Sequence, residues 1–360
     1  MKKYPILKWS LTIIASLILM IVAFGFWFVS LLTTDTPVDI KSTQRSDLPY
    51  LNQTPQPFKG KILAVVTSCA VMGSSQKKTG YELTELARPY FVFEANGYEV
   101  DVASPLGGKP PVIIDWDDMG AFDYAFLNDA NTQEKANNTI AINNINADDY
   151  DAIYFAGGKG AMFDFPENEK IQSIIREMYQ SGKVIGAVCH GPAALVNVTL
   201  EDGTPLLKNK NVSGFTNEEE LFLIPDANTI FPFLLQDKMS AQGANFNQGT
   251  MYLQNVQKEG QLVTGQNPWS TWSFSETIIE QLGYQPVKRN KTAEENTVEV
   301  LMAYEETGYA GAKKEIKHFI SNGNKPIDKN LLAMHSIVAA MQWKIGKTIN
   351  IIRLLSFANQ

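Results

Sequence analysis

The chain has 360 residues, of which 44% are hydrophobic, so it is long enough for one large domain with additional segments. Its formal net charge of -7 argues against a nucleic-acid partner. Two cysteines exclude a disulfide framework, and with only three histidines we expect no metal site.

An uncharged apolar run occupies residues 9–32. At about 1.5 Å per residue, it is longer than the roughly 30 Å of hydrocarbon in a bilayer. Three lysines precede the run, so the positive-inside rule predicts a cytoplasmic N-terminus at 1–8 and an extracytoplasmic location for the rest. A cleaved signal peptide is the alternative, but its apolar core spans about 7–15 residues and ends at a small-residue site. This run is longer and lacks such a site, so we expect a single-pass anchor.

The next stretch, residues 33–58, is polar and contains four prolines, which favours a linker. From 59 to 285, short β-branched apolar runs alternate with helical patterns. This alternation predicts an α/β domain, a flavodoxin-like three-layer sandwich with a mainly parallel sheet. Sites in such folds lie beyond the carboxyl ends of the strands, and Cys189 lies at such an end.

After a polar hinge, residues 286–360 show helical periodicity without strand patterns, and we expect about four helices there. Apolar residues spaced along two helical faces are Leu331, Met334, Ile337, Val338 and Met341, and Ile345, Ile349, Ile352 and Leu355. We expect these faces to pack against the main domain. The alternative is a partner or membrane-surface helix whose polar side carries Lys344, Lys347 and Arg353.

One cysteine stands at a predicted strand-turn-helix corner, in "GKVIGAVCHGPAAL" at 182–195. A helix N-terminus lowers the pKa of a thiol, so the corner favours a reactive thiolate at Cys189. Its arrangement is that of a nucleophile elbow, and backbone N–H groups at the turn can stabilise an oxyanion. A buried, inert cysteine is the alternative. Neighbours on a helix do not face each other, so direct deprotonation of Cys189 by His190 is not predicted.

The corner and the segments around it resemble the ThiJ/PfpI family of the class I glutamine amidotransferase-like superfamily. The resemblance covers residues 60–284. It is carried by "KILAVVTS", "TGYELTELARPYFVFEANGYEVDVASPLGGKPP", "YDAIYFAGGKGAMFDF", "GKVIGAVCHGPAAL", "GFTNEEE", "FLLQDKM" and "LVTGQNPWS". The branch that the chain is most similar to is the heat-shock-protein-31-like glyoxalases III, which need no glutathione.

The resemblance implies a role for each matching residue. Cys189 matches the nucleophile, His190 the acid/base beside it, and Glu220 the acidic residue that orients the histidine. Glu85 matches the glutamate at the sulfur, which must be protonated to donate to a thiolate. The remaining matches are the oxyanion and substrate-binding positions Gly157, Gly158 and Gly191.

Some of these assignments have alternatives. Glu218 and Glu219 stand beside Glu220, and Glu82 is the weaker candidate for the glutamate at the sulfur. The family also often carries histidine where this chain has Lys159.

The resemblance implies a cofactor-free enzyme that converts methylglyoxal or related 2-oxoaldehydes to 2-hydroxy acids. A membrane-tethered chaperone or redox sensor and a cysteine peptidase are the alternatives. A glutaminase would need a later His-x-Glu, and no histidine occurs between His190 and His318. A homodimer and a protein partner for the C-terminal helices stay open, as does pairing of Cys69 with Cys189.

Overall fold

The computed structural model describes residues 5–32, 39–116, 118–323 and 326–359. The chain divides into two compact units. One unit is the α/β core at Asp39–Asn290, and the other joins the N-terminal segment to Lys291–Gln360. We describe each unit by itself.

Within the described residues of the α/β unit, the main sheet has seven strands in the order β10-β11-β7-β6-β1-β3-β5. Their bounds are β1 Gly60–Val65, β3 Tyr98–Ser104, β5 Ile140–Ala141, β6 Ala152–Phe155, β7 Val184–Val188, β10 Val256–Glu259 and β11 Leu262–Gly265. Neighbouring strands are parallel except β10 and β11, which form an antiparallel pair. Strands β6, β7 and β11 are buried along their whole length, as expected for a sheet covered on both faces.

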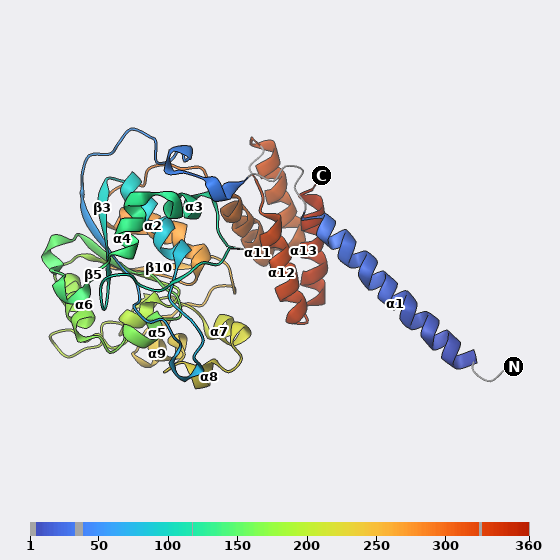
Figure 1. Ribbon diagram of the computed structural model, residues 1–360, viewed down its shortest axis with the longest axis horizontal. Coiled ribbons are helices and arrows are strands. Elements are labelled where there is room, and N and C mark those ends of the chain that lie inside the picture. Colours follow the sequence, from blue (N-terminus) through green and yellow to red (C-terminus); the bar gives the residue numbers. More distant parts are fainter. Residues whose placement is uncertain (1–4, 33–38, 117, 324–325, 360) are drawn as a thin grey trace. The chain divides into compact units, whose positions relative to one another are not determined.

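Helices cover both faces of this sheet (Figure 1). The longer ones are α2 Leu83–Ala95, α3 Ala121–Asn128, α4 Ala130–Asn137, α6 Glu169–Gln180 and α10 Thr271–Gln281. The steps from β1 to β3 and from β6 to β7 run in opposite directions across the sheet. Right-handed crossovers therefore place α2 and α6 on opposite faces, and α10 packs against α2. The mostly parallel α/β sheet predicted from the sequence is confirmed.

Shorter elements surround the core. They are the helices α5 Ala161–Asp164, α7 Asn217–Leu223, α8 Ala227–Ile230 and α9 Leu235–Ala241, and the parallel pairs β2 Tyr81–Glu82 with β4 Val112–Ile113 and β8 Asn211–Val212 with β9 Asn245–Phe246. Strand β2 lies directly before α2, and α7 follows β8, so one strand of each pair leads into a helix that carries candidate site residues.

The compact unit begins before the expected domain boundary at residue 59. Leu48 and Tyr50 are buried, and Arg45 forms an ion pair of 2.6 Å with Glu94 on α2. The apolar residues scattered through this polar, proline-containing stretch create no periodic pattern, so the sequence suggested a linker. Residues 39–58 instead belong to the packed unit.

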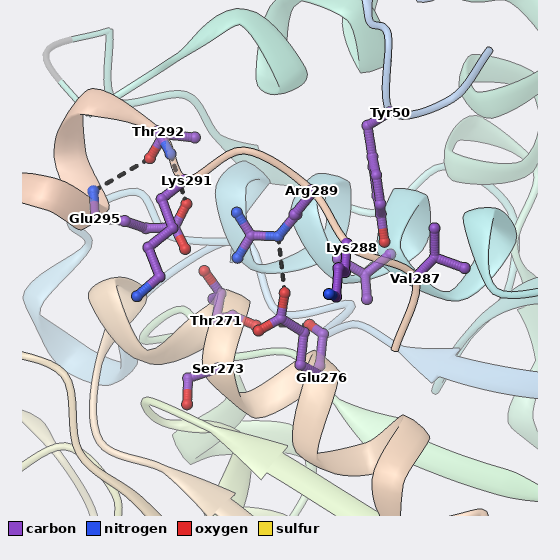
Figure 2. A network of polar contacts seen from close by, with 12 residues as sticks. Tyr50, Thr271, Ser273, Glu276, Val287, Lys288, Arg289, Lys291, Thr292 and Glu295 are labelled. Carbon is purple, nitrogen blue, oxygen red and sulfur yellow. Dashed lines mark hydrogen bonds and ion pairs between the residues drawn. The ribbon is translucent and has the colours of Figure 1, made fainter. Parts of the chain in front are cut away.

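The predicted hinge after residue 285 also packs on this unit as far as Asn290. Arg289 donates from Nε to Glu276 Oε1 on α10 at 2.9 Å, as Figure 2 shows. Its guanidinium lies 4.1 Å from the centre of the Trp272 ring. The backbone N–H of Val287 donates to Asn96 at the end of α2. These contacts fasten the end of the α/β unit onto α2 and α10.

Three helices follow, α11 Ala293–Ser321, α12 Lys329–Met341 and α13 Ile345–Phe357, and they lie side by side (Figure 1). Gly308 has φ +72° and interrupts α11, so α11 consists of two helical parts. The two predicted apolar faces are only partly used. Leu331 and Leu355 are buried, whereas Ile337, Met341, Ile345 and Ile349 are exposed. Packing of these faces against the α/β unit, as we expected, concerns a contact between the two units and stays a prediction.

The N-terminal helix α1 spans Pro5–Ser30. Its window Ile13–Ser30 has a mean hydropathy of 2.5, and none of its residues whose burial the structure describes is buried. By length and composition it is able to cross a membrane.

Candidate active site

Cys189, directly after β7, has an unusual backbone conformation. Its φ is +59°, a left-handed conformation that is costly for a residue other than glycine. Two hydrogen bonds hold it there: its N–H donates to Gly265 O at 3.0 Å, and its carbonyl accepts from the N–H of Phe215 at 2.8 Å. Strain maintained by its surroundings is typical of functional positions. The element that follows is the short 3-10 turn Gly191–Ala194 rather than the α-helix we expected.

The backbone around this elbow lies so close to neighbouring atoms that some positions have room only for glycine. A Cβ at Gly191 would lie 2.1 Å from Phe155 O, at the end of β6. A Cβ at Gly157 would lie 2.4 Å from Glu85 Oε2 and 2.7 Å from Cys189 Cβ. Glycine at these two positions lets the strand ends, the sulfur and the Glu85 carboxyl come together.

The side chains of Cys189 and His190 meet although they are sequence neighbours. Cys189 Sγ lies 3.3 Å from His190 Nδ1, and His190 Nε2 lies 2.6 Å from Glu220 Oε2. The left-handed elbow is not a helix, so the rule that adjacent helical residues point apart does not apply. An ionised Glu220 favours the tautomer with hydrogen on Nε2, which leaves the Nδ1 lone pair facing the thiol.

Two aromatic rings flank the imidazole of His190. The Phe215 ring centre lies 4.5 Å from that of His190, and the Phe231 ring lies at 6.3 Å in a stacked orientation. His190 is buried, so these contacts restrict the ring to the position in which both of its nitrogens have partners.

The three glutamates of the acidic run "EEE" have three different environments in the structure. Glu220 reaches His190, whereas Glu218 accepts from Gln248 Nε2 near the surface. Glu219 is buried and accepts five hydrogen bonds, from the backbone and hydroxyl of Thr216, the Tyr252 N–H, Gln266 Nε2 and Asn267 Nδ2. Of the three, Glu220 alone contacts the histidine, which is the alignment we favoured.

Glu85 lies in the first turn of α2 and is completely buried. Its Oε2 accepts from the N–H of Gly157 at 2.6 Å, and its carboxyl lies beside the Cys189 side chain, with no hydrogen-bond partner for Oε1 among the described residues. Burial, reinforced by the charge of nearby Glu82, raises the pKa of Glu85 to about 8. A carboxyl with this pKa is mainly protonated at neutral pH.

Burial also raises the pKa of the Cys189 thiol well above its usual value, and the carboxyls of Glu85 and Glu82 act in the same direction. The low pKa that we expected at a helix N-terminus is wrong for the resting site. The thiol is 3% exposed and precedes a turn of four residues, so desolvation outweighs any helix dipole. A thiolate here needs His190 to accept the proton when substrate arrives.

The oxyanion positions are arranged around the same elbow. Gly158 has φ +97°, and a Cβ there would lie 2.3 Å from Gly80 O. The N–H of Gly157 is occupied by Glu85. Among the described residues, the N–H groups of Gly158 and His190 donate to no protein acceptor, which leaves them available to an oxyanion.

Two charged residues next to this group, Glu82 and Lys159, were not among the main candidates in the sequence analysis. Burial raises the pKa of Glu82 to about 7, and the charge of Lys159 opposes that shift. The charge of Lys159 likewise opposes the raised pKa values of Glu85 and Cys189. Lys159 follows the double glycine, so its place in the sequence pointed to the site, but only the fold brings it within range of both glutamates.

Cys69 does not join this group. Its Sγ donates to the carbonyl of Val71 at 3.1 Å, and both cysteines are free. Strand β6 separates β1 from β7 in the sheet, so the two strands that precede the cysteines are not neighbours. The condition under which we expected the two cysteines to approach is not met.

A mostly parallel α/β sheet with a strained cysteine at the end of a central strand has the arrangement of a nucleophile elbow. The model of the DJ-1/PfpI family matches residues 77–221. The glutathione-independent glyoxalase HSP31 of Saccharomyces cerevisiae is 32% identical over 62% of this chain and 98% of its own length. Glyoxalase 3 of Candida albicans is 30% identical over 61% and 97%.

Two solved structures agree with these relatives. The crystal structure of glyoxalase III from Candida albicans superposes with a TM-score of 0.54 at 28% identity, over 62% of this chain and 97% of that one. The Francisella tularensis Rapid Encystment Protein gives a TM-score of 0.59 at 35% identity, over 62% and 99%. The chain belongs to the DJ-1/PfpI family.

Proposed function

We propose that this chain is a membrane-anchored, glutathione-independent glyoxalase that converts methylglyoxal or related 2-oxoaldehydes to 2-hydroxy acids. The observation that carries the proposal is the continuous contact from Cys189 through His190 to Glu220, with the Glu85 carboxyl also at the sulfur. The similarity to relatives named glutathione-independent glyoxalases supports the same reaction.

The first step forms a carbon–sulfur bond. His190 Nδ1 takes the thiol proton as Cys189 Sγ adds to the aldehyde carbon, which gives a hemithioacetal. Negative charge develops on the former carbonyl oxygen, where the N–H groups of Gly158 and His190 stabilise it. Glu220 stabilises the imidazolium that forms.

The second step moves a proton between neighbouring carbons. A base removes the hydrogen of the former aldehyde carbon and returns it to the ketone carbon, while the hydroxyl proton of the hemithioacetal passes to the ketone oxygen. One carbon is thereby oxidised and the other reduced. Glu85 suits this task once it has given its proton to the oxyanion of the hemithioacetal, because a carboxylate with a pKa near 8 is a stronger base than an ordinary one. The product is a thioester of the 2-hydroxy acid, which water cleaves to restore the thiol. The balance needs no external oxidant or reductant.

The test is production of lactate from methylglyoxal by the purified full chain without glutathione. We expect Cys189→Ser to reduce the rate to the level without enzyme. Cys69→Ser is the matched control, because it removes the other cysteine outside the group, and it should retain activity. Undiminished lactate formation by Cys189→Ser would refute the proposal.

We further propose that α1 anchors the chain in a membrane as a single-pass helix, with its N-terminus in the cytoplasm and the α/β unit on the opposite side. Its apolar window and the three lysines on its N-terminal side support this orientation.

A further inference from the structure

An exposed apolar surface lies at the connected ends of α12 and α13. Its members, which we call the hairpin tip, are Ile337, Met341, Trp343, Ile345 and Ile349. Trp343 is 86% exposed and Met341 is 62% exposed. Apolar side chains gathered at one end of a helical hairpin are typical of a binding surface, because scattered single residues would need no explanation.

The hairpin tip is an ordered part of the fold. Trp343 adopts φ +58°, and its N–H donates to Ala340 O at 2.9 Å. The next N–H, of Lys344, donates to Ala339 O at 2.9 Å. These bonds satisfy the last carbonyls of α12 and fix the reversal into α13. The exposed residues of each helix are four apart, so each pair shares one helical face.

The charge of this region differs from that of the whole chain. No acidic residue follows Asp328, whereas four basic residues do, in a chain with a net charge of -7. Lys347 pairs with Glu305, and Arg353 lies over the Tyr309 ring. Within the described residues, no acidic group pairs with Lys344 at the hairpin tip, so an exposed cation stands among the exposed apolar side chains.

We propose that the hairpin tip inserts into the headgroup region of a bilayer that contains anionic lipids. Tryptophan and aliphatic side chains beside lysine suit that region, where apolar groups enter the acyl boundary and cations meet phosphates. A second copy of the chain is a poorer occupant, because it would bring two basic hairpins together. Protein interfaces are also depleted in lysine. This inference stands on the C-terminal helices and does not depend on the proposed reaction.

The test places a spin label at Gly346→Cys in a Cys69→Ser background of the full chain. Gly346 has no neighbour within 4 Å of an added Cβ, and Cys189 is buried. The labelled chain is reconstituted into nanodiscs of phosphatidylglycerol or of phosphatidylcholine. Collisions of the label with oxygen, which partitions into lipid, are compared with collisions with a water-soluble nickel complex.

We expect a several-fold higher oxygen-to-nickel ratio in phosphatidylglycerol than in phosphatidylcholine. The double substitution Trp343→Ser and Ile345→Ser should abolish the difference. Leu223→Ser is the matched control, because it removes an exposed leucine from α7, and it should leave the ratio unchanged.

Three results would overturn the inference. If the label collides with the nickel complex equally often in both lipids, the hairpin tip stays in water. A label protected from both reagents is covered by protein. If the label enters both lipids to the same depth, anionic headgroups are not needed for insertion. Unchanged circular dichroism shows that the substituted chains remain folded.

Discussion

Three consecutive glutamates at the start of α7 have different partners, so their substitutions separate catalysis from stability. Glu220 holds the His190 ring, Glu219 joins Thr216 to the loop around Tyr252, and Glu218 is near solvent. A carboxylate that accepts five buried hydrogen bonds organises the backbone, whereas one that touches an imidazole controls a proton.

We predict that Glu220→Gln lowers kcat by roughly 10²–10⁴-fold with little loss of stability, because the histidine loses its charged partner. Glu219→Gln should lower the thermal midpoint more than it lowers kcat, since the amide cannot accept the same bonds. Glu218→Gln is the control and should leave both unchanged. Steady-state kinetics with thermal unfolding check this, and equal loss of kcat in the first two variants would contradict it.

Glu85 makes stability depend on pH in a direction that its burial decides. Its pKa is about 8 in the folded chain and about 4.3 when unfolded, so between these values the folded state holds an extra proton. Stability from this group is therefore present at low pH and falls as pH rises through this window, by up to about 1.4 kcal/mol per unit.

We predict that Glu85→Gln is less sensitive to this rise in pH, because the amide does not titrate. The measurement is the denaturation midpoint of both proteins between pH 5 and pH 8, with Glu218→Gln as an exposed control. A difference between Glu85→Gln and the unmodified chain that stays constant across this range would count against a protonated Glu85.

Among the elements, the buried strands were predicted from sequence patterns, whereas the packing of the segment 285–290 was not. Buried strands produce continuous apolar runs, so β1, β6 and β7 were visible. The segments 39–58 and 285–290 were assigned to a linker and a hinge. Their packing depends on a few side chains that meet distant helices, and such contacts leave no periodic pattern.

We predict that Arg289→Ala lowers the stability of the α/β unit by about 1–3 kcal/mol, because the buried guanidinium holds Glu276 and lies over Trp272. Arg289→Lys keeps the charge but loses the planar contact, so it should recover only part of the loss. Chemical unfolding checks both, with the exposed Lys288→Ala beside it as control. Full stability of Arg289→Ala would show that the segment does not fasten the unit.

For the molecule as a whole, the proposed anchor predicts a topology. The α/β unit should be digested by a protease added to the extracytoplasmic side of intact cells, while a tag at the N-terminus stays protected. A chain without residues 5–32 should lose most of this membrane association and keep part of it on anionic membranes through the hairpin tip. Protection of the α/β unit until the cells are opened would reverse the proposed orientation.

The sequence by itself determined the α/β class, the helical C-terminal region and the short list of candidate residues. Each is a local property, because burial on both sheet faces and a tight turn require particular residues at particular positions. The tertiary structure decided which glutamate reaches His190, that the ring touches its own neighbour Cys189, and that burial raises rather than lowers the thiol pKa. Those outcomes depend on a left-handed elbow and on desolvation by segments far away in the chain, which no local pattern contains.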